Sequence, residues 1–156
     1  MDNTIKPFDS NSNFRQISFE YEQIKYEISV SLYSNLIFII ISSEGKITNL
    51  YSMDTDSFSE ENTFYHEEED NSEIEIAKCI LGDRRNEKNQ FIANLLLSYL
   101  CKSISSKSDK IEKIILSLNL NNTNNKTENT LNFELSKETK ELIDILKIDL
   151  NKIFNI

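Results

Sequence analysis

The stretch IEIAKCILGDRRNEKNQFIANLLLSYLCKSISSKSDKIEKIILSLNL, residues 74–120, decides the fold of this chain. Its pattern predicts a strand over 74–81, a turn over 82–83, an apolar helix over 88–104 and a second strand over 111–120. The apolar residues of the helix recur with a spacing that forms one stripe: Phe91, Ile92, Leu95, Leu96, Tyr99, Leu100 and Ile104. Because a helix buries such a stripe only against a sheet or another helix, the rest of the chain must supply that surface.

The residues before this stretch predict most of a sheet. Apolar and polar residues alternate from Ile17 to Leu32, with a break in phase at Gln23 that predicts a bulge or a tight hairpin. The continuous apolar run at 36–41 predicts a strand that is covered on both faces and is therefore central in its sheet. A hairpin at 43–46 would lead into a returning strand at 47–53. We therefore expect these four strands to form an antiparallel meander.

The end of the chain predicts a second helix. Residues 130–135 suit a short extra strand, and Ser136 is a good N-cap for a helix over 137–154. The apolar stripe of this helix consists of Leu142, Leu146, Leu150 and Ile153, and it is widened by Ile143, Ile145 and Ile148. A stripe of that width indicates a helix that contacts both a sheet and a partner.

These elements predict an α+β fold with a roughly six-stranded antiparallel β-sheet packed with two main α-helices. A chain of 156 residues suits one domain, which we place at 14–156 after a loose N-terminal tail over 1–13. Two segments of this domain lack periodicity. Residues 54–72 are acidic and predict a disordered insertion, and residues 121–130 predict an Asn-rich loop.

The net charge of −9 is concentrated in one segment of the chain. Ten acidic residues and no Lys or Arg lie between 54 and 75, so the remainder carries −9 − (−10) = +1. Such a chain offers little positive surface, and we expect it to bind neither nucleic acid nor an anionic membrane. No signal peptide is visible, and the longest apolar run is far below the roughly 20 residues that span a bilayer. We therefore expect a soluble protein of the cytoplasm or the nucleus.

Few residues suggest chemistry. His66, the sole histidine, lies within YHEEED at 65–70, which could ligate a divalent cation. A solvated charge run is the stronger interpretation, because an irregular segment lacks groups that orient metal ligands. Cys79 and Cys101 suit buried, reduced thiols. The pair at 84–85, Arg-Arg, suits either an acidic partner or a polar turn. Because the common catalytic and nucleotide-binding motifs are missing from the sequence, we expect no enzyme, no cofactor and no metal.

With these elements in order, the chain resembles the proteasome assembly chaperone 4 family, that is, the small proteasome assembly chaperones 3 and 4. The resemblance covers roughly residues 13–154 and lies in LIFII at 36–40, ILGD at 80–83, IILSLNLNNT at 114–123 and the helix that begins after Ser136. It implies a six-stranded antiparallel sheet with helices packed on it. It also implies pairing with the sister chaperone 3, or with a second copy in isolation, and binding to an alpha-type subunit while the 20S proteasome alpha ring assembles.

The family brings no catalytic residues, and no interface residue of this chain can be matched to it one by one. The acidic segment and the Asn-rich insertion depart from the family pattern. The competing hypothesis is a small trafficking or signalling scaffold of the longin or roadblock kind, which also combines a sheet with helices. The two hypotheses differ in the proteins that would co-purify.

Overall fold

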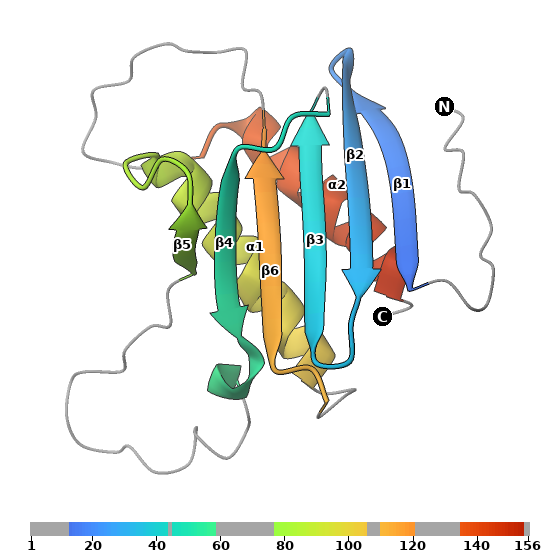
Figure 1. Cartoon of the computed structure of the whole chain (residues 1–156). Helices are drawn as coiled ribbons and strands as arrows, with labels where there is room; N and C mark the ends of the chain where they lie inside the picture. Colours follow the sequence, from blue (N-terminus) through green and yellow to red (C-terminus); the bar gives the residue numbers. More distant parts are fainter. Residues whose placement is uncertain (1–12, 44, 59–76, 106–109, 121–134, 155–156) are drawn as a thin grey trace.

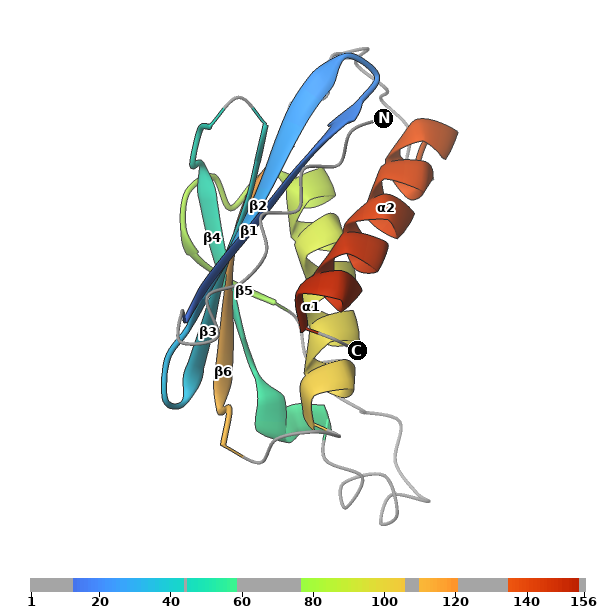
Figure 2. The same ribbon diagram turned by 90° about the vertical axis from the view of Figure 1, so that its right-hand side faces the viewer.

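A computed structural model describes residues 13–43, 45–58, 77–105, 110–120 and 135–154 (Figure 1). The elements in chain order are β1 (Phe14–Tyr21), β2 (Ile24–Leu32), β3 (Leu36–Ser43), β4 (Asn49–Asp54), the 3-10 helix η1 (Thr55–Phe58), β5 (Lys78–Leu81), α1 (Glu87–Ser105), β6 (Lys113–Asn119) and α2 (Lys137–Phe154). The strands form one six-stranded sheet, and both α-helices pack on the same face of it (Figure 2). The predicted α+β class is therefore confirmed.

The sheet is mixed, and this corrects the predicted antiparallel sheet. Its strand order is β1-β2-β3-β6-β4-β5, in which β6 runs parallel to β3 and antiparallel to β4. The predicted meander ends at β3, and residues 43–46 form no hairpin because β6 lies between β3 and β4. The sequence of β6, which is apolar on consecutive residues, suits a central strand. The pairing of β6 with both β3 and β4 outweighs the turn signal of Gly45, which predicted that β3 and β4 would pair with each other.

The turn between β1 and β2 is a tight hairpin, one of the two alternatives that the phase break left open. Glu22 and Gln23 have φ angles of 51° and 64°, and they connect strands whose register is regular from Tyr21↔Ile24 to Phe14↔Ser31. Two positive φ angles at the central positions are typical of the two-residue turns that match the twist of a hairpin.

The helices begin at side-chain caps. Ser136 Oγ accepts a hydrogen bond from the Thr139 backbone N–H at 3.3 Å, as predicted for the second helix. Asn86 Oδ1 accepts from the Asn89 N–H at 3.0 Å and caps α1. Both helices match their predicted ranges within about two residues.

The predicted insertion at 54–72 begins too early. Asp54 belongs to β4, and residues 55–58 form η1. Thr55 is buried, and its backbone N–H donates to the Glu112 carbonyl at 2.9 Å, so this end of the segment is fixed by tertiary contacts that periodicity does not reveal. Residues 59–72 of the predicted insertion lie outside the described residues. So do 1–12, 121–130 and the parts of two predicted strands at 74–76 and 130–134.

The core lies between the sheet and the helices. On β3, Ile37, Ile39 and Ile41 are almost fully buried, whereas Leu36 and Phe38 are only half-buried. The strand is central, as predicted. The prediction that both of its faces are covered is wrong for the described part of the chain, because α1 and α2 lie on one side only.

Candidate protein-interaction face

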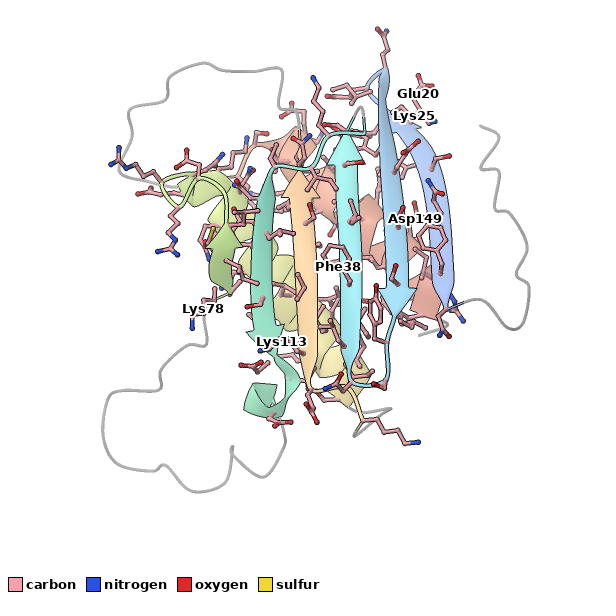
Figure 3. All side chains as sticks on the ribbon, viewed as in Figure 1. Glu20, Lys25, Phe38, Lys78, Lys113 and Asp149 are labelled. Carbon is pink, nitrogen blue, oxygen red and sulfur yellow. The ribbon has the colours of Figure 1, made fainter. Side chains whose placement is uncertain are left out.

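The face of the sheet opposite α1 and α2 is covered by no described element, and we call it the open face (Figures 2 and 3). Large apolar side chains follow one another across four neighbouring strands of this face, in the order β3, β6, β4 and β5. We call these residues the apolar band: Leu36, Phe38, Ile40, Ile115, Leu50 and Leu81. Strand register makes them neighbours, since Phe38 lies beside Ile115, and Ser117 lies between Ile40 and Leu50.

The band is half-buried at its centre and exposed at its end. Its central members on β3 are half-buried, although no described helix covers them, whereas Leu81 is 62% exposed at the β5 edge. The register shifts between Leu50 and Tyr51, so the adjacent Ile80, which is 49% exposed, is an extra residue in β5. Contiguous exposed apolar residues on a sheet face are characteristic of a protein-binding surface.

Charged residues lie around the rim of the open face (Figure 3). Lys25 Nζ lies 2.9 Å from Glu27 Oε1 near one end of β2. At the other end of the sheet, Lys113 Nζ lies 3.2 Å from Asp54 Oδ1. Lys78 extends from the β5 edge. An apolar centre with a charged rim is the usual composition of a protein–protein interface.

Hydroxyl groups separate the apolar side chains on this face. Ser29, Ser31, Ser42 and Ser52 are half-buried or buried there. Ser117, at the centre of β6, is fully buried, and its hydroxyl has no hydrogen-bond partner among the described residues. Buried hydroxyls are usually hydrogen-bonded, so this one is an unused polar group in the middle of the band.

Gly82 of the ILGD motif fixes the turn that ends the band. Its φ angle is 108°, and a Cβ atom there would lie 2.9 Å from the Asn49 Cα atom, so only glycine fits. Asn49 is buried, and its Oδ1 accepts from the Asp83 N–H at 3.0 Å while its Nδ2 donates to the Tyr51 hydroxyl at 3.0 Å. These contacts hold the β5–α1 turn against β4.

Asn119 of the LNLNNT motif lies at the same end of the sheet as Asn49, since the preceding Leu118 pairs with Asn49. Its Nδ2 donates to the Lys46 carbonyl at 2.9 Å, and its own carbonyl accepts from Ser43 Oγ at 3.3 Å. The connection from β3 to β4 is thereby attached to the end of β6. Both motifs shape the sheet, and their roles depend on contacts with distant residues. The only local signal for them is asparagine at the start or end of a strand, where it is uncommon.

The residues considered for chemistry do not converge. His66 lies outside the described residues. Cys79 is half-buried in β5, Cys101 is buried in α1, and neither forms a disulfide bond. Arg84 and Arg85 are exposed in the turn before α1. Within the described ranges, no three His, Cys, Asp or Glu residues gather as a metal site would require.

Neither α1 nor α2, the helices of the described part of the chain, is apolar enough over its length to cross a membrane. No protein-family model matches the chain, and no curated protein is significantly similar to it.

Proposed function

We propose that the protein is a proteasome assembly chaperone subunit that resembles chaperone 4. In this proposal it pairs with the sister chaperone 3 and binds an alpha-type subunit while the 20S alpha ring forms, in the cytoplasm or the nucleus. The observation that carries the proposal is the open face with its apolar band, which lacks a covering layer among the described residues.

A sheet of similar size is the partner that suits this face. Two sheets that pack face to face lie about 10 Å apart and interdigitate the side chains of their inner faces. The band supplies such side chains from four strands, and Phe38 lies near its centre (Figure 3). A sister chaperone with the same two-layer fold would bring an equivalent sheet face, and in its absence a second copy of this chain would take its place.

The rim supports specificity rather than affinity. Lys113 and Asp54 form an exposed pair, as do Lys25 and Glu27, and such pairs contribute little to affinity but penalise partners with mismatched charges. Because α1 and α2 occupy the other side of the sheet, the outer surface of the helices stays available for the alpha-type subunit. The proposal needs no catalytic residue, metal or cofactor.

The test is affinity purification of the tagged protein from its own cells, followed by mass spectrometry. We expect alpha-type proteasome subunits and one small partner, without mature proteasome. The variant Phe38→Asp should lose the small partner, because it places a charge at the centre of the band. The variant Ile148→Asp is the matched control, since Ile148 is 54% exposed on the helix side.

Recovery of GTPases and trafficking components in place of proteasome subunits would favour the scaffold hypothesis. Full retention of the small partner by a folded Phe38→Asp variant would show that the open face is not the pairing surface. Circular dichroism of both variants establishes that they are folded before they are compared.

A further inference from the structure

The two edge strands of the sheet are protected to different degrees. β5 has only four residues, begins with Lys78 and carries the register shift opposite Leu50 and Tyr51. A short strand, a lysine and a bulge are common means by which a sheet edge avoids pairing with another chain. β1 has eight residues and contains no lysine or proline, and its pairing with β2 is regular from end to end. β1 is therefore the edge that can accept another strand.

The hairpin determines which residues of β1 bond to β2. In a two-residue hairpin the residues that flank the turn form a hydrogen-bonded pair, and here they are Tyr21 and Ile24. Hydrogen-bonded and non-hydrogen-bonded pairs alternate along an antiparallel ladder. The bond from the Leu32 N–H to the Asn13 carbonyl, at 2.7 Å, continues this series. The odd-numbered residues of β1 are thus the ones that are hydrogen-bonded to β2.

The even-numbered residues of β1 direct their backbone groups outward. Gln16, Ser18 and Glu20 lie between the bonded residues, so their N–H and C=O groups point away from β2. Beyond β1 the sheet has no further strand among the described residues, and Figure 1 shows β1 at the margin of the sheet. An extended chain placed there can hydrogen-bond to all three residues, because their outward groups recur at every second position.

α2 follows the same edge on the covered face of the sheet. Near its first turn, the Tyr21 hydroxyl donates to Glu141 Oε2 at 3.2 Å and also lies 3.3 Å from the Glu138 carbonyl. At the other end of the helix, the Arg15 side chain donates to the Ile153 carbonyl. Both ends of α2 therefore contact β1. Figure 2 looks onto this edge and shows α2 in front of α1.

The side of α2 next to this edge is partly apolar. Ile145 and Ile148 follow Glu141 by four and seven residues, so all three side chains lie along one side of the helix. That side is the one that Glu141 brings against Tyr21. Ile145 is half-buried, and Ile148 is exposed over about half of its surface. An exposed apolar side chain beside an open strand edge enlarges the surface that a partner can cover.

We propose that β1 pairs with β1 of a second copy of this chain, antiparallel and about a two-fold axis at Ser18. This register places Ser18 opposite Ser18 of the second copy and Gln16 opposite Glu20. All the outward backbone groups of these residues are then paired. A hydroxyl faces a hydroxyl and an amide faces a carboxylate, which are cross-strand pairs that stabilise a ladder, and no like charges lie opposite each other.

A second copy suits this surface better than an extended peptide does. A peptide would pair with the β1 backbone but would leave Ile148 in water. A two-fold axis perpendicular to the sheet keeps both helix layers on the same side, so the second copy brings its own α2 beside the side that carries Ile145 and Ile148. Burial of these side chains then adds to the backbone hydrogen bonds. The inference does not rest on the proposed function, because it uses the sheet edge and leaves the open face available.

The first test is disulfide cross-linking at the edge, with peptide mapping that also recognises any bridge from Cys79 or Cys101. Opposite residues of a hydrogen-bonded pair have Cα atoms about 5.5 Å apart, within the range of a disulfide. Ser18→Cys should therefore form a covalent dimer under mild oxidation. Glu20→Cys, on the same strand and face, is the matched control, because its two copies would lie about 14 Å apart. A mixture of Gln16→Cys and Glu20→Cys should couple to each other.

The second test separates pairing at the edge from folding and from pairing through the open face. Sedimentation is measured on the Phe38→Asp protein, in which the open face is disrupted. We expect this protein to dimerise and the added variant Ser18→Pro to make it monomeric. Proline at 18 removes an N–H that points away from β2, so circular dichroism should stay unchanged. Ile148→Asp should weaken the dimer about tenfold or more, whereas Ile47→Asp, a similarly exposed isoleucine between β3 and β4, should not.

Three results would overturn the inference. A dimer that a folded Ser18→Pro protein retains would pair through another surface. Cross-linking of Glu20→Cys that equals that of Ser18→Cys would reflect random collision. A Phe38→Asp protein that stays monomeric at every accessible concentration would exclude the second copy as the occupant of the edge. None of these results bears on the recovery of a sister chaperone and alpha-type subunits, so the proposed function is tested separately.

Discussion

The two faces of the sheet are made by the same strands and differ in what lies between their apolar side chains. On the helix-covered face, Ile28, Ile39 and Leu116 are fully buried and contact further apolar residues of α1 and α2. On the open face, apolar residues alternate with hydroxyls, as at Ile40 and Ser117 in adjacent strands. A permanent core excludes polar groups, whereas a surface that must also exist in water tolerates them. The difference suits a face that is exposed until a partner arrives.

The largest expected effect is on the covered face. Leu96 of α1 is fully buried, and Leu96→Asp should destabilise the protein by about 4 kcal/mol or more, because the carboxylate would be buried without a partner. Leu81→Asp, at the exposed end of the apolar band, is the control and should leave a folded protein. Thermal unfolding followed by circular dichroism measures both. A natively folded Leu96→Asp protein would show that the stripe of α1 is wrongly placed.

Adjacent residues of β3 test the two faces directly. Ile39→Ala should reduce the free energy of unfolding by about 3 kcal/mol, because Ile39 is fully buried beneath the helices. Phe38→Ala should reduce it by only about 1 kcal/mol, since Phe38 is half-buried, although its ring is larger. Urea denaturation at low protein concentration gives both values. Equal losses would indicate that the open face is covered in the isolated chain.

The two glycines test the turn that ends the apolar band. Gly82→Ala should cost about 2 kcal/mol more than Gly45→Ala, because the added Cβ meets Asn49 as well as an unfavourable φ. Gly45 has a φ of 70° and no heavy atom within 4 Å of an added Cβ, so its cost is the backbone preference alone, about 1 kcal/mol. Thermal denaturation compares the two variants, and equal costs would contradict the contact with Asn49.

Ser117→Ala should change the stability of the isolated chain by less than about 1 kcal/mol, because the hydroxyl it removes has no partner among the described residues. If a partner sheet satisfies this hydroxyl, the same variant weakens pairing. Sedimentation of the wild type and of the variant, each mixed with the partner, measures pairing separately from stability. A large loss of stability in the monomer would reveal a bond within the chain.

The smallest expected effect concerns Tyr21 at the β1–β2 hairpin. Desolvation and the hydrogen bond that its hydroxyl donates to Glu141 Oε2 at 3.2 Å raise the pKa of Tyr21 to about 12. A folded pKa above the unfolded value of 10.0 means that this contribution to stability is present below pH 10 and is lost as the pH rises towards 12. Ultraviolet titration of wild type against Tyr21→Phe should show one tyrosine with this high midpoint. If the tyrosine that the Tyr21→Phe variant lacks titrates near pH 10 in the wild type, the contact with Glu141 is contradicted.

Local periodicity was sufficient for the helices and for most strands, because each buries one face and the spacing of its apolar residues records that. The place of β6 between β3 and β4 could not be predicted, because it depends on pairing between residues far apart in the chain. The open face was missed for a related reason. An unbroken apolar run such as 36–41 signals apolar surroundings on both sides, but it does not say whether they come from the same chain. Asn49 and Asn119 act only through distant carbonyl and amide groups, and no spacing rule identifies them.

The position of β6 also has a consequence for how the protein is made. Leu36 of β3 pairs with Lys113 of β6, and 113 − 36 = 77 residues separate them. During synthesis, the hairpins of β1, β2 and β3 leave the ribosome long before the strand that completes the centre of the sheet. Until then β3 presents an unpaired apolar edge, which is the kind of intermediate that aggregates or recruits a holding chaperone. Folding of this chain should therefore be slow for its size, and its late step should be the insertion of β6.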